Sequence, residues 1–200
     1  VRQWLLSKDS NANAHPLVAA TPFAGERPVG MAGLGNFATL DYCWFHSEIE
    51  DPLQRLMASR EANIEMKQHL AEVKEAGADL NALMNVLPNW SIRLIRRWIK
   101  GKKGSIGFFG NLVISNVPGP KEALFLDNWK VDNWFSTGQI ADGTALNMTL
   151  WSYAGKANLC ILADRAVLPD GWVLFNYFLA EIDALDALLD QGKAQAETVA

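Results

Sequence analysis

The chain has 200 residues, of which 50% are hydrophobic and 20% are charged, a composition that is ordinary for a globular protein with one large or two small domains. Its formal net charge of -4 argues against a general nucleic-acid-binding protein, because such a protein needs a basic surface to neutralise phosphates. No apolar run approaches the roughly 20 residues that span a bilayer, and the polar residues after Leu6 argue against a signal peptide.

The first part of the chain predicts the end of a helix and then two strands. Residues 1–6, VRQWLL, are typical of the last turns of a helix, so we expect the chain to be part of a longer protein. The apolar run 15–23 contains two prolines, and the run 37–47 is rich in aromatic and other strand-forming residues. Residues 24–36 are rich in glycine and predict the loop between these strands.

Asp51 and Pro52 predict the beginning of the next helix. An aspartate can accept hydrogen bonds from the free N–H groups of a first turn, and proline fits the first helical position. Gly77 fits the end of this helix. The expected apolar face is incomplete and consists of Leu53, Leu56, Met57, Ile64 and Val73. Because the residues between them are polar, we expect much of this helix to be solvated.

Residues 91–100, SIRLIRRWIK, predict a basic amphipathic helix. The apolar side holds Ile92, Leu94, Ile95, Trp98 and Ile99, and the basic side holds Arg93, Arg96, Arg97 and Lys100. A helix of this kind can lie in a membrane interface. The candidate lipid-surface residues are therefore Arg93, Arg96, Arg97, Trp98 and Lys100. The alternative is a helix that packs on the core with its basic side in solvent.

The second half of the chain predicts a strand, a hairpin and a long helix. The apolar run 112–114 ends at Ser115 and Asn116, because the prolines of the following VPGP cannot donate to a central strand. Alternating residues in the range 146–161, with Gly155 at the turn, predict a β-hairpin. The stripe of the last helix consists of Leu174, Phe178, Ile182 and Leu185.

This order of elements predicts a mixed α/β, α+β-like fold with a mixed, largely antiparallel sheet and flanking helices. We expect one domain over residues 1–190 and a frayed tail over residues 191–200. Cys43 and Cys160 are too few for a disulfide framework, so we expect two free thiols and a reducing compartment.

The residues by themselves show no complete active site. The histidines at positions 15, 46 and 69 lack zinc-ligand spacing, and the sequence has no CxxC, GxSxG or P-loop motif. We therefore expect no metal site and no catalytic residue in this chain. His46, at a strand end among aromatic residues, is the one histidine of interest.

Two stretches carry a family resemblance: NLVISNVPGPKEALFL, residues 111–126, and ADGTALNMTLWSYAGKANLCILADRAVLPD, residues 141–170. They resemble the C-terminal domain of the bacterial wax ester synthase/diacylglycerol acyltransferase family, which belongs to the CoA-dependent acyltransferase superfamily. DPLQRL, residues 51–56, is a weaker match, and the resemblance extends over nearly the whole chain. It implies one half of a chloramphenicol acetyltransferase-like fold.

The resemblance implies transfer of a fatty acyl group from acyl-CoA, as co-substrate, to a long-chain alcohol or diacylglycerol, with no other cofactor. The general base of the family is the second histidine of an HHxxxDG motif in the N-terminal half, and this chain has no such motif. The implied partners are the N-terminal catalytic domain and a lipid surface. The implied location is cytoplasmic, peripheral to the inner membrane or to lipid inclusions.

The candidate substrate-binding residues lie in the two stretches: Ser115, Asn116, Ala145, Leu146 and Asn147. Ser115 and Asn116 could shape an acyl or CoA channel, or could instead hold their own turn. A small side chain at Ala145 leaves room for an alkyl chain, so we expect a larger one to favour shorter alcohols, unless Ala145 is only a packing residue. Asn147 could bind a substrate head group or a neighbouring loop.

Two other functions stay open at the level of sequence. The domain could have kept the fold and lost the chemistry, serving as a non-catalytic lipid- or partner-binding domain. It could also belong to an enzyme that acylates another acceptor, such as an amine. The segment CWFHSEIEDP, residues 43–52, departs from the small, proline-containing run that is commoner in the family, which bears on the choice of substrate.

Overall fold

The computed structural model describes residues 1–9, 17–24, 38–75, 88, 90, 91, 94, 97, 110–140 and 143–199. Its bounded helices are α1 (Arg2–Lys8), α2 (Pro52–Glu75) and α5 (Gly171–Val199). Its strands are β1 (Leu17–Ala24), β2 (Ala38–Phe45), β3 (Leu112–Pro118), β4 (Phe125–Leu126), β5 (Trp129–Lys130), β6 (Leu146–Tyr153) and β7 (Lys156–Ala163). The predicted helix end, the first two strands and the β6–β7 hairpin therefore lie near the expected positions, whereas β3 extends beyond Ser115 and Asn116 to Pro118 and the hairpin β4–β5 was not predicted.

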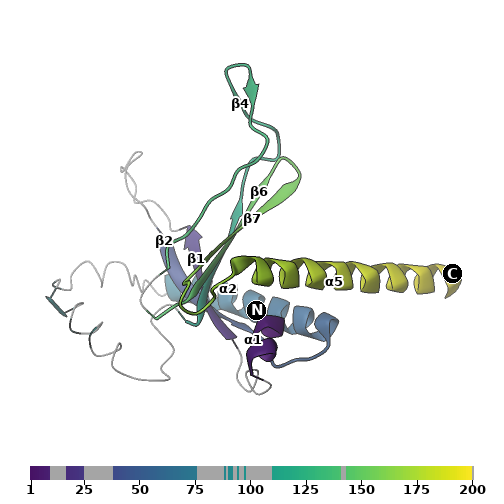
Figure 1. The fold of residues 1–200 in the computed structure, drawn as a ribbon, viewed down its shortest axis with the longest axis horizontal. Coiled ribbons are helices and arrows are strands. Elements are labelled where there is room, and N and C mark those ends of the chain that lie inside the picture. The colour runs from purple at the N-terminus through teal and green to yellow at the C-terminus, as the bar shows by residue number, and fades with distance from the viewer. Residues whose placement is uncertain are drawn as a thin grey trace.

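The main sheet has the strand order β2-β1-β3-β6-β7 (Figure 1). The inner strands β1, β3 and β6 pair in parallel, and the outer strands β2 and β7 pair antiparallel with their neighbours. The mixed α/β fold is thus confirmed, but parallel pairings are as many as antiparallel ones in this sheet. The antiparallel β6–β7 pair is a hairpin closed by a short turn at Ala154 and Gly155. The parallel pairs β1–β3 and β3–β6 join strands that are far apart in sequence, because parallel strands need a long connection.

The helices cover one face of this sheet, where the core lies (Figure 1). Ala19 of β1, Leu112 of β3 and Leu146 of β6 form a buried cluster there with Leu168 and Leu174. Leu174 belongs to the stripe predicted for the last helix and is 1% exposed. Leu174 of the α5 stripe thereby covers part of the three parallel strands on this side, as strands in the middle of a sheet require, whereas Ile182 of the same stripe is 40% exposed.

Residues 119–139 leave the sheet after β3 and return across its other face. The outgoing part, residues 119–130, which we call the arm, contains the two-stranded hairpin β4–β5 and projects from the sheet (Figure 1). The returning part, residues 131–139, which we call the strap, follows β6. The fold therefore covers one face of β6 with helices and the other with a segment that has no regular structure.

The strap is attached to β6 at both ends. The Tyr153 hydroxyl donates to the Val131 carbonyl oxygen at 2.8 Å and accepts from the Leu124 N–H at 2.7 Å. Tyr153 is 1% exposed, so these bonds satisfy a buried hydroxyl. At the other end, Asn147 Nδ2 donates to the Gln139 carbonyl oxygen at 3.2 Å. These contacts place the strap antiparallel to β6.

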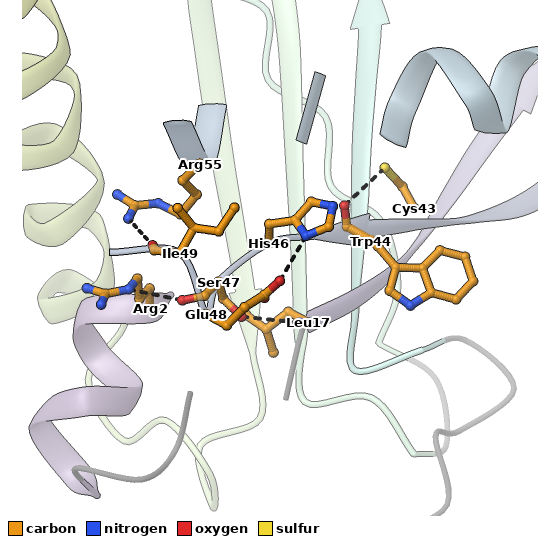
Figure 2. A network of polar contacts seen from close by, with 9 residues as sticks. All are labelled: Arg2, Leu17, Cys43, Trp44, His46, Ser47, Glu48, Ile49 and Arg55. Atoms are coloured by element: carbon orange, nitrogen blue, oxygen red, sulfur yellow. Dashed lines mark hydrogen bonds and ion pairs between the residues drawn. The ribbon is translucent and has the colours of Figure 1, made fainter. Parts of the chain in front are cut away.

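A network of hydrogen bonds fixes the turn between β2 and α2 (Figure 2). Ser47, which is 4% exposed, accepts from the Leu17 N–H through Oγ at 3.2 Å and from Arg2 Nε through its carbonyl oxygen at 3.0 Å. Arg55, in the first turn of α2, donates to the Ile49 carbonyl oxygen at 2.8 Å. The network therefore links α1, β1 and α2 at one end of the sheet.

The start of α2 is as predicted, but its apolar face is not. The side chains expected to pack are 40% to 55% exposed, namely Leu53, Leu56, Met57 and Ile64. The buried residue of this helix is Met66, at 6% exposure, and the side chain of Val73 lies outside the described part of the chain. The reason is that α2 lies beside the edge strand β2, so that little of its circumference faces the sheet.

Two smaller expectations concern the chain end and the cysteines. The helical backbone of α5 continues to Val199, through most of the segment 191–200 that was expected to fray, and the residues there are good helix formers. Cys43 and Cys160 are free, since they lie on β2 and β7 at opposite edges of the sheet. Burial raises the pKa of the Cys43 thiol, and the neighbouring Asp41 raises it further.

The cap of α2 leads to a prediction about stability. Asp51 Oδ1 accepts from the Gln54 N–H at 2.7 Å, so Asp51→Ala should lower the free energy of unfolding by about 1 kcal/mol. Urea unfolding followed by tryptophan fluorescence measures this change. Asp51→Asn is the matched control, because it keeps an acceptor and removes the charge. A loss as large in Asp51→Asn as in Asp51→Ala would show that the charge, and not the cap, stabilises the helix.

Candidate functional site

An apolar cavity lies between the helices and the face of the sheet that they cover. Its volume is about 370 Å³, which is within the usual range of small-ligand pockets. The strands contribute Leu17, Phe45, Leu112, Ile114 and Met148 to its lining. The helices contribute Leu56, Leu174, Phe178 and Leu185. A lining of this kind can hold an alkyl chain and offers few partners to a polar ligand.

Charged side chains also lie in this lining, namely Arg2, Arg55 and Glu181. Arg55 of α2 forms an ion pair with Glu181 of α5, which ties the two helices together beside the cavity. Burial lowers the pKa of Arg55, the nearby Arg2 lowers it further, and Asp51 opposes them. An arginine stays protonated at neutral pH even so, and the pair keeps its charges. The pair therefore holds the helices at a fixed spacing over the cavity.

His46 also lines the cavity, and it has a partner that the sequence pattern did not predict. Its Nδ1 lies 2.8 Å from Glu48 Oε1 (Figure 2). Burial acts to raise the pKa of Glu48, but hydrogen bonds from its own backbone N–H and from His46 prevail and lower it. Both side chains are about one third exposed. A carboxylate in this position orients the imidazole ring, as it does beside a general base.

The candidate residues Ser115 and Asn116 lie on opposite faces of the sheet. Side chains alternate along a strand, and the pairing of β3 with β6 puts Ser115 beside Thr149 and Asn116 beside Leu150. Ser115 is half-buried on the strap-covered face, whereas Asn116 is exposed on the helix-covered face. The side chains of the two residues therefore point to opposite faces of the sheet. Their neighbour Ile114, which was not a candidate, lines the cavity.

The candidates at the start of β6 are divided in the same way. Leu146 is part of the core on the helix-covered face. Asn147 is 3% exposed on the other face and donates to the strap, and its Oδ1 accepts from Thr149 Oγ1 at 2.9 Å. Of the two roles open to Asn147, the structure supports the contact with a neighbouring loop. Ala145 is half-buried, and its carbonyl oxygen accepts from the Asp164 N–H at 2.9 Å.

Two glycines make the close approaches that hold the arm and the strap. A Cβ at Gly119 would lie 2.1 Å from the Ser152 carbonyl oxygen, and one at Gly138 would lie 2.4 Å from Asn147 Nδ2. Neither position has room for a side chain. The string VPGP was expected to be unable to continue a central strand, but β3 includes Val117 and Pro118, which pair with Trp151 and Ser152 of β6. Pro118 is the last residue of the strand, so its missing N–H interrupts no further pairing. Gly119 then lets the chain pass directly over the end of β6.

The basic helix lies largely outside the described residues, which exclude Arg93, Arg96, Trp98 and Lys100. Arg97 is helical and exposed. Trp90 and Leu94 are also helical, at 68% and 64% exposure, and their spacing puts them on the same side of the helix as Arg97. The other apolar residues of this helix, Ile92, Ile95, Trp98 and Ile99, lie outside the described residues, so both the interfacial helix and the core-packed helix stay open.

No helix in the part of the chain that the structure describes is long and apolar enough to cross a membrane. No group of three histidine, cysteine or acidic side chains within the described ranges could hold a metal ion.

Comparisons with known proteins agree with this arrangement. The family model of the WS/DGAT C-terminal domain matches residues 34–186. A Mycobacterium tuberculosis protein named "Putative diacyglycerol O-acyltransferase Rv3087" is 42% identical over 180 residues, which are 90% of this chain and 37% of that protein. "O-acyltransferase WSD" of Acinetobacter baylyi is 28% identical over 189 residues, which are 94% of this chain and 39% of that protein.

A solved structure shares the fold. It is the wax ester synthase/diacylglycerol acyltransferase from Marinobacter aquaeolei VT8, with a TM-score of 0.63 and 23% identity, over 93% of this chain and 40% of that chain. This likeness confirms the CoA-dependent acyltransferase fold. The chain spans 37% of the Mycobacterium relative and 40% of the Marinobacter one. Because the family model covers most of its residues, the chain belongs to the WS/DGAT C-terminal domain family.

Proposed function

We propose that the complete protein is an O-acyltransferase that moves a fatty acyl group from acyl-CoA to a long-chain alcohol or to diacylglycerol. The observation that carries this proposal is the family match over residues 34–186, together with relatives named as diacyglycerol O-acyltransferase and O-acyltransferase WSD. Acyl-CoA is the co-substrate, and the transfer requires no other cofactor.

In this reaction a general base takes the proton of the acceptor hydroxyl while its oxygen attacks the thioester carbonyl. The oxyanion that forms needs donors placed in advance, and CoA then leaves as the thiol. The chain has no His-His pair to supply the base of the family. We assign the base to the N-terminal catalytic domain of the same protein, and the binding of apolar substrate parts to this chain.

Activity of the complete protein tests this division. We expect ester formation from palmitoyl-CoA with hexadecanol or dipalmitoylglycerol, measured by release of the CoA thiol and by chromatography of the lipid product. The chain of residues 1–200 alone should form no ester, because it lacks the base. Ester formation by this chain alone at the rate of the complete protein would overturn the assignment of the base. A complete protein without an HHxxxDG motif and without activity would instead indicate a non-catalytic binding domain.

We assign an alkyl chain of the substrate to the apolar cavity. Support comes from its volume of about 370 Å³ and from its lining of aliphatic and aromatic side chains. Burial of each methylene group stabilises a bound alkyl chain by about 0.8 kcal/mol. A lining residue therefore sets the preferred chain length by the space that it leaves.

Filling the cavity should change this preference. In the complete protein, Ile114→Phe should lower kcat/KM for hexadecanol at least about tenfold relative to decanol, because the larger ring takes the space of methylene groups. Leu162→Phe, on the exposed side of β7, is the control and should leave the ratio unchanged. Ala145→Leu tests the position expected from sequence. A shift in Ala145→Leu with none in Ile114→Phe would place the alkyl chain outside the cavity.

We further propose a cytoplasmic protein that binds the inner membrane or lipid inclusions peripherally through the helix at residues 91–100. Support comes from its run of basic residues and from the exposed Trp90, Leu94 and Arg97. Lysine and arginine near an anionic surface each contribute about 1 kcal/mol to binding. A lipid surface would also concentrate the water-insoluble acceptor.

Liposome flotation of the complete protein tests this surface. Combined charge reversal at Arg96, Arg97 and Lys100 should weaken binding to anionic vesicles by roughly 100-fold or more. The control reverses three other cations, Arg60, Lys67 and Lys121, which are exposed elsewhere on the chain. Unchanged flotation of the first variant, or an equal loss in the control, would exclude a specific role for this helix.

A further inference from the structure

The end of the arm exposes large apolar side chains that no part of the described chain covers. Phe125 is 63% exposed, Leu126 76% and Trp129 79%, and all three belong to the hairpin β4–β5. The hairpin projects away from the sheet and the helices (Figure 1). Leu126 and Trp129 are cross-strand partners on one face of the hairpin, and Phe125 lies on its other face. Large exposed apolar side chains grouped on one hairpin mark an interaction surface. Because these side chains lie at the end of a projecting hairpin, a partner that covers them has to lie outside this domain.

The arm is held rigidly at its base, so its exposed end is presented in a fixed direction. The Tyr153 hydroxyl bonds to Leu124 and Val131, which stand on the two sides of the hairpin base. The Val131 N–H also donates to the Leu124 carbonyl oxygen at 2.9 Å. These bonds fix the point at which the hairpin leaves the domain, and in the structure Phe125, Leu126 and Trp129 remain exposed beyond it.

The strap adds a second feature, which is an open backbone. From Val131 beside Tyr153 to Gln139 beside Asn147 it follows about 20 Å of β6, so it is largely extended. Residues 132–138 make no backbone–backbone hydrogen bond to another described residue. Two carbonyl oxygens of this segment accept from side chains, that of Asp132 from Lys156 Nζ at 3.1 Å and that of Gly138 from Thr137 Oγ1 at 3.2 Å. The residues between them can pair with the edge of a neighbouring sheet.

The charges of the arm favour a protein partner over a lipid surface. Asp127 and Asn128 form the turn at its tip, with Asp127 at a φ of 54°. A hairpin that enters lipid would have to bury this carboxylate first, at a high free-energy cost. The segment 121–135 also carries one more carboxylate than ammonium groups, so an anionic bilayer would not attract it.

The length of the relatives indicates which protein partner is expected. The chain accounts for 37% of the Mycobacterium relative and 40% of the Marinobacter one, so more than half of each has no counterpart here. We propose that the arm and the strap form the contact surface for the preceding part of the same polypeptide, which buries Phe125, Leu126 and Trp129 and pairs with residues 132–138. This inference rests on the proposed function only in taking the complete protein to be longer.

Hydrogen exchange of the complete protein tests the inference directly. Unpaired amides of residues 132–138 would exchange at nearly the rate of an unfolded chain, so docking should slow them at least 100-fold. The amides of the exposed Lys121 and Glu122 are the internal control and should stay fast. Fast exchange of residues 132–138 would overturn the inference. Protection that appears only with added vesicles, or only on dimerisation at high protein concentration, would overturn it in favour of a lipid surface or a second copy.

Photo-crosslinking identifies the occupant. With a benzophenone amino acid in place of Trp129, the expected product is an internal crosslink to a peptide that precedes this chain in the complete protein. The same amino acid at the exposed Trp172 of α5 is the control for non-specific capture. Crosslinks only to lipid, or only between two copies, would contradict the inference. Ester formation is assayed on the same samples. A docked arm in an inactive protein would contradict only the proposed function, whereas a free arm in an active protein would contradict only this inference.

Discussion

The rest of this structure depends on one constraint, which is that the central strands of the sheet must be covered on both faces. β1, β3 and β6 lie in the middle of the sheet and must be protected on both sides. Three helices cover one side, and Leu174 of α5 completes the buried cluster there. No helix in the described ranges covers β6 on its other side, where the strap takes that place. The two sides thus have different chemistry, and each has one candidate role.

The helix-covered side leaves an apolar space instead of closing completely. The ion pair of Arg55 with Glu181 holds α2 and α5 together beside this space, and the turn around Ser47 fixes the start of α2. A cavity kept open by fixed helices is suited to a flexible alkyl chain, because the chain and not the protein adapts its shape.

The strap-covered side shows how a small number of contacts can place a long segment. Trp134 stacks on Trp151 with ring centroids 5.6 Å apart, between the hydrogen bonds at Tyr153 and Asn147. Stacking of this kind adds about 0.5–1.5 kcal/mol beyond the area that it buries. The segment is therefore fixed without regular structure of its own, and its backbone remains available. The backbone of the strap is therefore the part of this domain that we propose to contact another domain.

Sequence alone determined the elements, because their signals are local. The proline at the start of α2, the short turn of the β6–β7 hairpin and the alternation of residues along β6 act within a few residues of the chain. The family was also readable, since the strings SNVPGP and LNMTLWSYAG survive as contiguous residues. The candidate site residues were chosen from the same strings, although adjacent residues of a strand point to opposite faces.

Only the tertiary structure decided which side chains meet. Strand alternation puts the side chains of Ser115 and Asn116 on opposite faces of the sheet. Asn147 binds the strap, and Ile114 and Met148 line the cavity. The exposure of the apolar residues on α2 followed from its position beside an edge strand. Such pairings join residues far apart in the chain, and their physical cause is the packing of whole elements, which no local pattern records.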